Sequence, residues 1–340
     1  MKTCAAMTIA ALLVGCSPAA EKDVNRLIVY SAGPRPLAEA ICTSFASNAG
    51  VRVDLFQATT GQILARLEAE KYRPRADVIL LAGEVPAHAL KKQGRLAPFR
   101  PACADRLRAE WCDPDGAYWG SAATLVGVAL RQDRAREAPR SWSEWFQIDD
   151  ARRVVMPSPS RSGATGDFVV GLALDLGETV LPGFARLRLR GMDFAAANNQ
   201  AIQALSMGVY DALLGAVDYI IYQQILRGEP LEMMYPEDGA VLVTRPMAIL
   251  SSSRRQELAR RFVEHYLSEE SQQRVARACL IPARLDVPAH PIRGAEPQRV
   301  IRPDPDLAVA RQAALLRKFQ LEIERAASRR ALQRAAGEVR

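Results

Sequence analysis

Short apolar runs alternate with amphipathic stretches from residue 26 onward. The runs at 26–30, 51–56 and 77–81 predict buried strands, because each is short, largely apolar and bounded by polar residues. Apolar residues at helical spacing between these runs predict helices at 36–46 and 61–71. Strands that alternate with helices at this spacing are typical of a parallel, doubly wound α/β sheet.

The same alternation continues through the middle of the chain. Strands are predicted at 153–156, 213–216 and 241–250, and helices at 168–176 and 217–226. The strand at 241–250 follows a second set of strand–helix units, and we expect it to return toward the first set. The remaining predictions are a strand at 231–235 followed by a turn, a short helix ending near residue 94, amphipathic helices at 254–267 and 269–278, and a basic helix from 307 to about 332.

Composition bounds the class of protein. The 340 residues are enough for two domains, and 49% hydrophobic and 24% charged residues are ordinary for a chain with packed cores. This composition excludes a disordered or coiled-coil protein, and no apolar run is long enough for a multi-pass membrane protein. The net charge of +7 is uneven, because the last 35 residues hold eight Lys or Arg against four Asp or Glu. The rest of the chain is only mildly basic, and we therefore expect no nucleic-acid partner.

The first 15 residues have the pattern of an export signal. A positive charge at Lys2 precedes a short run of apolar and small residues. Leu13-Val14-Gly15-Cys16 resembles the bacterial lipobox, in which the cysteine is lipidated and becomes the first mature residue. The alternative is an ordinary signal peptide that contains a cysteine. We predict a signal peptide at 1–15, a lipidated Cys16 with a linker at 16–25, and a periplasmic protein anchored by its lipid to a bacterial membrane.

Four cysteines remain once the leader and Cys16 are set aside. Cys103 and Cys112 lie nine residues apart in a loop-like stretch, which makes them a candidate disulfide in an oxidising compartment. Cys42 and Cys279 could form bridges or be small buried hydrophobic residues. No C-x-x-C motif is present, so the sequence offers neither a zinc knuckle nor a redox pair.

Small and hydroxyl-bearing residues gather where predicted strands lead into helices. Ligands of doubly wound sheets bind at this edge, and helix N-termini attract anions through their free N–H groups and their dipole. The alternative is that these Ser and Thr residues simply cap the helices. Because several such loops share one make-up, we predict an oxyanion site. Its candidate residues are Ser31, Thr59, Thr60, Ser160, Ser162, Gly163, Ala164 and Thr165, with Arg161 either as a counter-charge or pointing to solvent.

The order of several short motifs resembles a known family. Y-S-A-G, a helix opened by T-T-G, P-x-A-D-V, S-x-S-G-A-T, V-D-Y, Y-P-E-D-G and L-S-E-E-S-Q-Q follow one another between about Arg26 and Ile281. In this order and spacing they resemble the extracellular solute-binding proteins of ABC transporters. Within that family the chain looks like the branch that holds ferric-iron, phosphonate and sugar-phosphate binders.

This resemblance implies a periplasmic-binding-protein type II fold, with two doubly wound α/β lobes joined by crossing strands and the ligand cleft between them. It places the first lobe at 26–130, the second at 131–245, a return to the first at 246–300 and a basic C-terminal helix at 301–340. It also implies closure of the lobes on the ligand and delivery to a membrane permease powered by an ATPase. We expect a monomer with no cofactor.

The identity of the ligand follows less directly. Ferric-iron binders of this family carry an adjacent tyrosine pair at the place that corresponds to 217–222, because phenolates are hard anionic donors. Here Tyr219 and Tyr222 are three residues apart on one helix face. The adjacent pair is therefore missing, and iron held by these two tyrosines is the alternative ligand.

The V-D-Y and Y-P-E-D-G motifs look more like the members that bind organic phosphates or phosphonates. The Ser and Thr loops would hold the phosphoryl oxygens, while Asp218, Tyr219 and Glu237 would contact an amine or hydroxyl groups at the other end. An aminophosphonate such as 2-aminoethylphosphonate and a sugar phosphate both meet this description. Asp218 could instead be a helix N-cap, and Glu237 a turn residue.

Enzyme motifs are missing from the sequence. H-E-x-x-H, G-x-S-x-G and G-x-x-x-x-G-K-[ST] are all absent, and three histidines leave few general bases. We therefore predict a non-enzymatic, lipid-anchored solute-binding component of an ABC importer that captures a phosphonate or an organic phosphate. The alternatives are a ferric-iron carrier and a ligand-sensing subunit of a receptor kinase.

Overall fold

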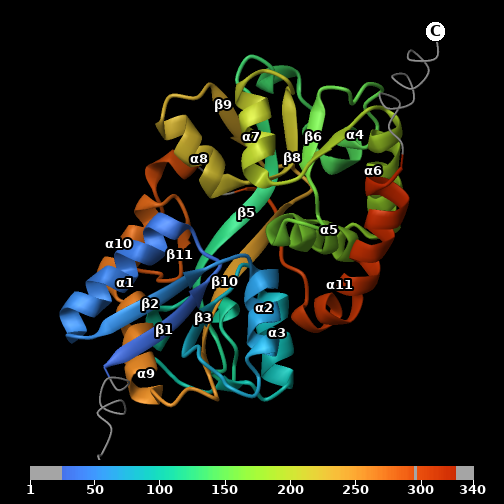
Figure 1. Ribbon diagram of the computed structural model, residues 1–340. Coiled ribbons are helices and arrows are strands. Elements are labelled where there is room, and N and C mark those ends of the chain that lie inside the picture. Colours follow the sequence, from blue (N-terminus) through green and yellow to red (C-terminus); the bar gives the residue numbers. More distant parts are fainter. Residues whose placement is uncertain (1–24, 295–296, 327–340) are drawn as a thin grey trace, which may run out of the picture.

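One mixed β-sheet runs through both halves of the molecule, with helices packed against it (Figure 1). The computed structural model describes residues 25–294 and 297–326, and all elements named below lie in these ranges. The main path of the sheet has the strand order β2-β1-β3-β10-β5-β8-β6-β7. The outer strands are parallel and belong to two α/β lobes, whereas β10 and β5 in the middle are antiparallel and connect them. This is the two-lobed α/β fold that the sequence predicts.

The first lobe is built on the strands predicted near the start of the chain. β1 (Arg26–Ser31) pairs in parallel with β2 (Arg52–Gln57) and β3 (Val78–Leu80). α1 (Arg35–Ala49) has proline in its first turn and ends at Gly50, whose left-handed backbone conformation is typical of a helix C-terminus. The other elements of this lobe are α2 (Thr60–Ala69), α3 (Glu84–Lys92), β4 (Leu96–Ala97), α9 (Gln256–Tyr266), α10 (Glu269–Arg277) and β11 (Ile281–Pro282).

The second lobe repeats this arrangement around β6 (Val154–Pro157), which pairs in parallel with β7 (Asp193–Ala195) and β8 (Ala212–Val217). Its core contains the fully buried rings of Phe168 and Phe184, whose centroids are 6.3 Å apart. Burying one such side chain contributes about 1.5–3 kcal/mol. The other elements are α4 (Trp142–Trp145), α5 (Gly163–Asp175), α6 (Val180–Leu189), α7 (Asn198–Ser206), α8 (Asp218–Leu226) and β9 (Leu231–Met234).

Two long strands, β5 (Trp119–Arg131) and β10 (Ala240–Leu250), cross between the lobes as an antiparallel pair. β10 also pairs with β3 in the first lobe, and β5 with β8 in the second. The register shifts between Arg245 and Pro246, where proline has no N–H to donate to the ladder. β5 was not predicted from the sequence, because its residues are small or apolar and nearly all buried. They lack the alternation that marks a strand with one exposed face.

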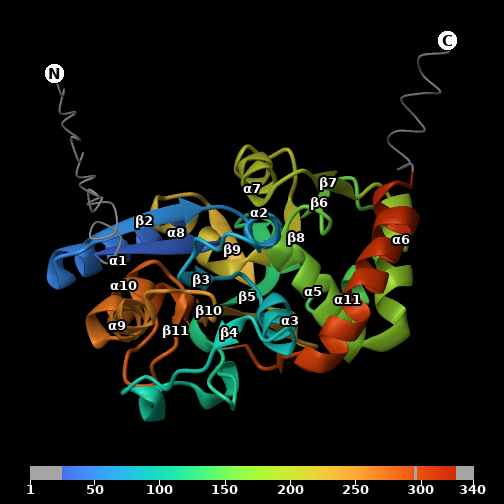
Figure 2. The same ribbon diagram turned by 60° about the horizontal axis from the view of Figure 1, so that its bottom comes forward.

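The C-terminal helix α11 (Pro305–Phe319) packs against both lobes, lying beside α3 and α5 (Figure 2). Near its start, Asp306 is hydrogen-bonded to His88 of α3 at 2.9 Å. Further along the helix, Gln312 donates to Asp167 of α5 at 2.8 Å. The helix therefore connects the lobes at a second place, away from the crossing strands.

The last helix is shorter than the predicted 307 to about 332. It ends at Phe319 and continues as one turn of π-helix at Gln320–Glu324, while residues 327–340 lie outside the described part of the chain. Phe319 and Ile323 are buried in the core of the second lobe, as their spacing predicts. Before the helix, β12 (Val300–Ile301) pairs in parallel with β10.

The candidate disulfide between Cys103 and Cys112 is not formed, and both are free thiols. The Cys103 thiol donates to the carbonyl oxygen of Leu267, while the Cys112 thiol donates to that of Arg108. Burial raises the pKa of the Cys112 thiol to about 11, which keeps it protonated and unreactive. Cys42 and Cys279 are also free thiols and are buried, so they belong to the cores as small hydrophobic residues.

The predicted signal peptide and Cys16 lie outside the described residues. Within the described part of the chain, no helix is long and apolar enough to cross a membrane.

Candidate ligand-binding cleft

A cavity of about 240 Å³ lies between the two lobes, at the carboxyl ends of the parallel strands. In the first lobe it is lined by residues that follow β1 and β3 and by the N-terminus of α2. In the second lobe it is lined by the N-terminal ends of α5, α7 and α8, which face the first lobe (Figure 1). None of its lining residues is Asp or Glu, whereas Arg161 and Arg245 both line it. The cleft is therefore electropositive and suited to an anion.

Arg245 on β10 is a buried cation without a counter-charge. It is 6% exposed, and within the described residues it forms no ion pair. One guanidinium nitrogen donates to the carbonyl oxygen of Ala32 at 3.3 Å, and the guanidinium carbon lies 5.3 Å from the centre of the Tyr219 ring. Its Nε atom has no hydrogen-bond partner in the described part of the chain. A buried cation of this kind is costly unless an anion completes the site.

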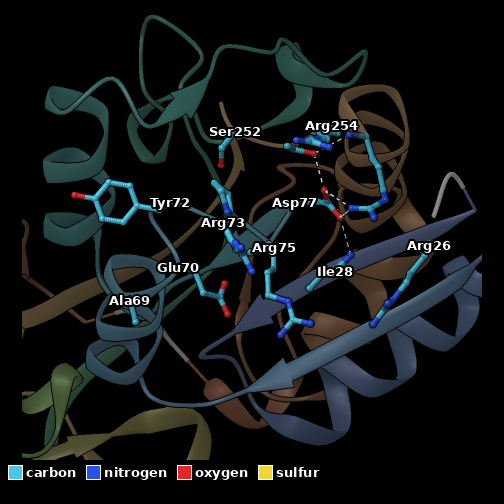
Figure 3. A pocket seen from close by; sticks show the side chains of 14 residues that line it. Arg26, Ile28, Ala69, Glu70, Tyr72, Arg73, Arg75, Asp77, Ser252 and Arg254 are labelled. Carbon is cyan, nitrogen blue, oxygen red and sulfur yellow. Dashed lines mark hydrogen bonds and ion pairs between the residues drawn. The ribbon is translucent and has the colours of Figure 1, made fainter. Parts of the chain in front are cut away.

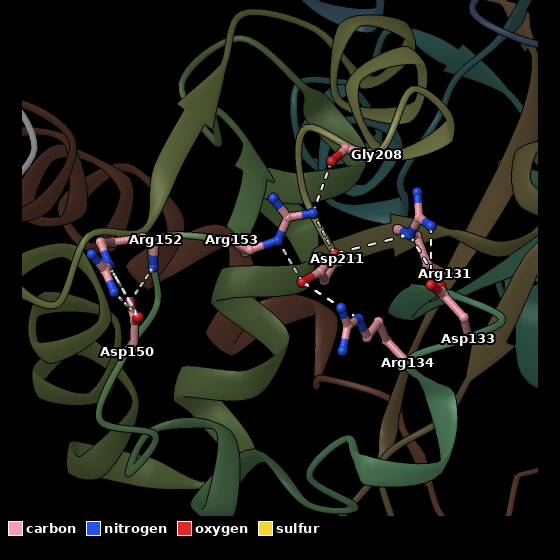
Figure 4. Close-up of polar contacts among 8 residues, drawn as sticks. All are labelled: Arg131, Asp133, Arg134, Asp150, Arg152, Arg153, Gly208 and Asp211. Atoms are coloured by element: carbon pink, nitrogen blue, oxygen red, sulfur yellow. Dashed lines mark hydrogen bonds and ion pairs between the residues drawn. The ribbon is translucent and has the colours of Figure 1, made fainter.

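Three arginines at the far end of the second lobe, in contrast, share a carboxylate. At the end of β8 away from the cleft, Asp211 accepts hydrogen bonds from Arg153 at 2.6 and 2.7 Å (Figure 4). Arg131 and Arg134 each lie 3.9 Å from the same carboxylate. The hydrogen bonds from Arg153, and then the charges of all three arginines, hold the pKa of Asp211 below its usual value. Unlike these three arginines, the buried Arg245 has no carboxylate beside it.

Six of the predicted site residues line the cavity. Thr59 and Ser162 are the N-caps of α2 and α5, and the Ser162 hydroxyl oxygen accepts a hydrogen bond from the backbone N–H of Thr165. The capping role that the sequence left open is therefore real, but it does not exclude ligand binding, because other N–H groups of each first turn remain free. The six lining residues are Thr59, Thr60, Ser162, Gly163, Ala164 and Tyr219.

Two further predicted residues, Ser31 and Thr165, are fully buried and do not line the cavity. The Ser31 hydroxyl oxygen accepts a hydrogen bond from the N–H of Gly33 at 3.1 Å. The Thr165 hydroxyl donates to the Ser162 hydroxyl oxygen at 2.8 Å. Both residues hold the loops in place from within the lobes.

The remaining three predicted residues do not line the cavity. Ser160 donates to the carboxylate of Glu324 at 2.8 Å, which connects the loop before α5 to the turn after α11. Asp218 is fully buried and ion-paired with Arg293. Glu237 is exposed in the turn between β9 and β10. The structure thus places both carboxylates that were assigned to the far end of the ligand outside the cleft.

The two tyrosines considered for iron do not face the same space. Tyr219 lines the cavity, whereas Tyr222 is buried with its hydroxyl 3.0 Å from that of Tyr235. Burial raises the pKa of Tyr222, which disfavours the phenolate form that iron would need. Within the described residues, no group of three or more His, Cys, Asp or Glu could hold a metal ion.

Two polar residues of the cleft, Arg245 and Asn198, were not predicted. Asn198 accepts a hydrogen bond from the Ser162 hydroxyl at 3.1 Å and so connects the N-termini of α7 and α5. The sequence signal for α7 is the polar run Asn198-Asn199-Gln200 before apolar residues at helical spacing. The signal for Arg245 is a single charge inside the apolar strand V-L-V-T-R-P-M-A-I-L, since a charge in such a place requires a reason.

Two α/β lobes joined by crossing strands, with a cavity between them, are the architecture of two-lobed solute-binding proteins. Residues 73–307 match the family model described as bacterial extracellular solute-binding protein. The chain belongs to this family. It is a periplasmic solute-binding component of an ABC importer and not an enzyme, and such a component delivers a small ligand to a permease and ATPase.

Similar proteins support this assignment. The chain is 32% identical over 162 residues to a protein of Sinorhizobium fredii named probable ABC transporter periplasmic-binding protein y4fP; the match covers 46% of this chain and 44% of that relative. The fold is similar to that of iron-bound HitA from Pseudomonas aeruginosa, with a TM-score of 0.78, 22% identity and coverage of 87% and 99%. It is also similar to AfuA from Actinobacillus pleuropneumoniae with fructose-6-phosphate bound, with a TM-score of 0.77, 21% identity and coverage of 88% and 99%. These likenesses confirm the predicted fold class.

Proposed function

We propose that the protein captures a small organic phosphate, such as a sugar phosphate, in the cleft between its lobes. The observation that carries this proposal is Arg245, a buried arginine with an unpartnered Nε beside a cavity that no carboxylate lines. Phosphoryl oxygens match the planar donors of a guanidinium group. The N-termini of α2, α5 and α7 supply further N–H donors around the same cavity.

The lining of the cleft favours a hydroxyl-bearing phosphate over an aminophosphonate. An ammonium group would need a carboxylate partner, and Asp218 and Glu237 both lie elsewhere. Hydroxyl groups can instead bind to the side chains of Thr59, Thr60 and Asn198, which line the cavity. A volume of about 240 Å³ suits a small ligand.

Closure of the lobes completes the proposed site. We place the hinge where β5 and β10 cross, near the paired residues Thr124 and Val243, and keep the lobe boundaries at 26–130, 131–245 and 246–300. Arg245 lies two residues beyond this crossing, so a ligand that binds it also contacts the strand on which the lobes turn. Closure would then bring the helix N-termini of both lobes onto one anion.

Membrane attachment is the other part of the proposal. Leu13-Val14-Gly15-Cys16 has the lipobox pattern, and we propose that Cys16 is lipidated and that residues 17–25 form the linker to the first lobe. The lipid would anchor the protein at the membrane without a spanning helix.

The test is a thermal-shift screen of the form Ser17–Arg340, which retains every described residue and therefore both cores. The panel holds glucose 6-phosphate, fructose 6-phosphate, glycerol phosphates, phosphoglycerate, 2-aminoethylphosphonate, inorganic phosphate, sulfate and ferric citrate. A ligand that binds the folded state alone adds about 2.7 kcal/mol of stability at a hundredfold excess over its Kd. We expect this shift with one of the organic phosphates.

Arg245→Gln is the variant that tests the site itself. Because hydrogen bonds to charged groups contribute about 1.5–3 kcal/mol, the variant should bind the phosphate at least about tenfold more weakly. Without ligand it should be as stable as the wild type or more stable, since a buried, unpaired charge has been removed. The matched control is Arg227→Gln, an exposed arginine at the end of α8, which should change neither property. A shift with ferric citrate alone, or full phosphate affinity in Arg245→Gln, would contradict the proposal.

A further inference from the structure

A second hollow, of about 860 Å³, lies at the base of the first lobe (Figure 3). It is lined by Arg26 and Ile28 of β1, by residues 69, 70 and 72–77 from the end of α2 to the start of β3, and by residues 252–255 after β10. The interlobe cleft is lined by residues that follow the opposite ends of β1 and β3, so the two sites lie at opposite ends of these strands. We name the second site the arginine hollow after Arg26, Arg73, Arg75, Arg254 and Arg255.

The acidic side chains of the arginine hollow are already neutralised by other contacts. Glu70 is paired with Arg66 at 2.8 Å and accepts a hydrogen bond from the Tyr30 hydroxyl. Asp77 is paired with Arg255 at 3.3 Å. Neither carboxylate is therefore available to balance the remaining arginines of the hollow.

Three of these arginines lack a counter-charge. Arg73, Arg75 and Arg254 are exposed, and none of them forms an ion pair with another residue in the described part of the chain. Next to them the ring of Tyr72 is 88% exposed. Tyrosine side chains favour the boundary between water and lipid, where the ring contacts an apolar phase and the hydroxyl remains hydrated.

We propose that the arginine hollow and Tyr72 form a docking face for the anionic headgroups of a phospholipid membrane. The described chain starts at Asn25, next to Arg26 of the hollow. Only residues 17–25 lie between Cys16 and Arg26. Nine extended residues span at most about 30 Å. A lipid on Cys16 would therefore keep this face within reach of the headgroups. The tether argument rests on the proposed lipidation, whereas the charge and the exposed Tyr72 do not.

Docking in this orientation turns the interlobe cleft away from the anchoring membrane. The cleft lies at the far ends of β1 and β3 from the arginine hollow, so solutes can enter it while the base of the first lobe contacts lipid. The bound face would act together with the lipid, since one acyl-chain signal and one basic patch reinforce each other at a membrane.

The experiment is co-sedimentation of the form Ser17–Arg340, which carries no lipid, with vesicles of phosphatidylcholine mixed with phosphatidylglycerol or of phosphatidylcholine alone. We expect binding to the mixed vesicles alone, and a loss of binding as salt is added. An arginine near an anionic surface contributes about fivefold in affinity, so the variant Arg73→Gln/Arg75→Gln/Arg254→Gln should bind about a hundredfold more weakly.

The control variant Arg136→Gln/Arg227→Gln/Arg311→Gln removes the same charge from exposed arginines outside the hollow and should bind like the wild type. Equal losses in both variants would mean that net charge alone attracts the protein, and would overturn the proposal. Displacement by inorganic phosphate at constant ionic strength would show a small-anion site in place of a membrane face. A lack of binding to the mixed vesicles would overturn the proposal as well. The hollow variant should keep the wild-type thermal shift with phosphate ligands, so a failure here is separate from a failure of the proposed cleft.

Discussion

Arg245 and Asp218 are both buried charges, but their surroundings give them different roles. Arg245 has no carboxylate partner and lies against the interlobe cavity. Asp218 accepts hydrogen bonds from the Thr124 hydroxyl, from the backbone N–H of Leu125 and from the Tyr235 hydroxyl, and it is paired with Arg293. A buried charge without a partner indicates a ligand site, whereas a buried charge that is paired and hydrogen-bonded indicates a structural role.

Asp218→Asn tests this assignment at the residue scale. Removing the carboxylate leaves Arg293 buried without its counter-charge, so we expect the free energy of unfolding to fall by about 3–5 kcal/mol. The affinity of the folded fraction for a cleft ligand should stay close to that of the wild type. Urea unfolding and ligand titration measure the two quantities. The exposed Glu237→Gln should change stability by less than about 0.5 kcal/mol. An Asp218→Asn protein of normal stability and weak binding would instead assign Asp218 to the ligand.

At the scale of elements, the sequence predicts what short-range patterns determine. The strands near the start of the chain and the helices between them were recognised because apolar residues recur at the spacing of each element. β5 was not recognised, because it lies in the middle of the sheet and is apolar on both faces. α7 was not recognised either, although it carries Asn198 to the cleft.

The candidate site was predictable to a similar extent. Residues at helix starts, such as Thr59 and Ser162, follow from local sequence, and both line the cleft. Arg245 reaches the cleft from a strand, and its role depends on long-range packing that brings Ala32 and Tyr219 beside it. Asp218 and Glu237 have the chemistry for a ligand, but the fold turns one inward and the other to solvent.

The junction of α5, α11 and α3 holds a carboxyl group whose protonation we expect to affect stability. Asp167 of α5 accepts a hydrogen bond from Gln312 of α11 through one carboxylate oxygen. The other carboxylate oxygen lies so close to Gly83 that a Cβ atom added to this glycine would be 2.1 Å from it. Desolvation raises the pKa of Asp167 to about 7, and the hydrogen bond from Gln312 opposes this rise. In the unfolded chain Asp167 loses its proton near pH 4. The neutral carboxyl therefore contributes its full stability to the fold below that pH, and this contribution is lost as the pH rises to about 7.

Asp167→Asn should remove this pH dependence. The variant stays neutral, so its stability should match the wild type near pH 4, exceed it increasingly up to about pH 7 and then remain higher by at least about 1 kcal/mol. Urea midpoints across this range measure the difference. Asp306→Asn in the same junction should instead be less stable than the wild type by a constant amount above about pH 4 and should approach it at lower pH, because hydrogen bonds from Lys92 and His88 lower the pKa of Asp306. Parallel pH profiles for the wild type and Asp167→Asn would contradict the expectation.

At the scale of the whole molecule, the sheet gives the protein two functional ends. The parallel strands of both lobes direct their carboxyl ends and the following helix N-termini toward the cleft. The opposite ends of β1 and β3 carry the arginine hollow. Because β5 and β10 join the lobes through one continuous sheet, ligand capture and membrane contact occupy distinct surfaces of one connected structure.

This arrangement makes attachment at Cys16 the property to examine in cells. The described chain begins beside the arginine hollow, so a lipid at Cys16 would hold the protein at that end and leave the cleft free. We expect the full chain to incorporate labelled palmitate when it is expressed in a bacterium, and Cys16→Ser to incorporate none. Cys4→Ser, which alters the cysteine inside the predicted leader, should be labelled like the wild type. Labelling that persists in Cys16→Ser would place the lipid elsewhere, and an unlabelled wild type would leave the basic face at the base of the first lobe as the membrane contact to be tested by vesicle binding.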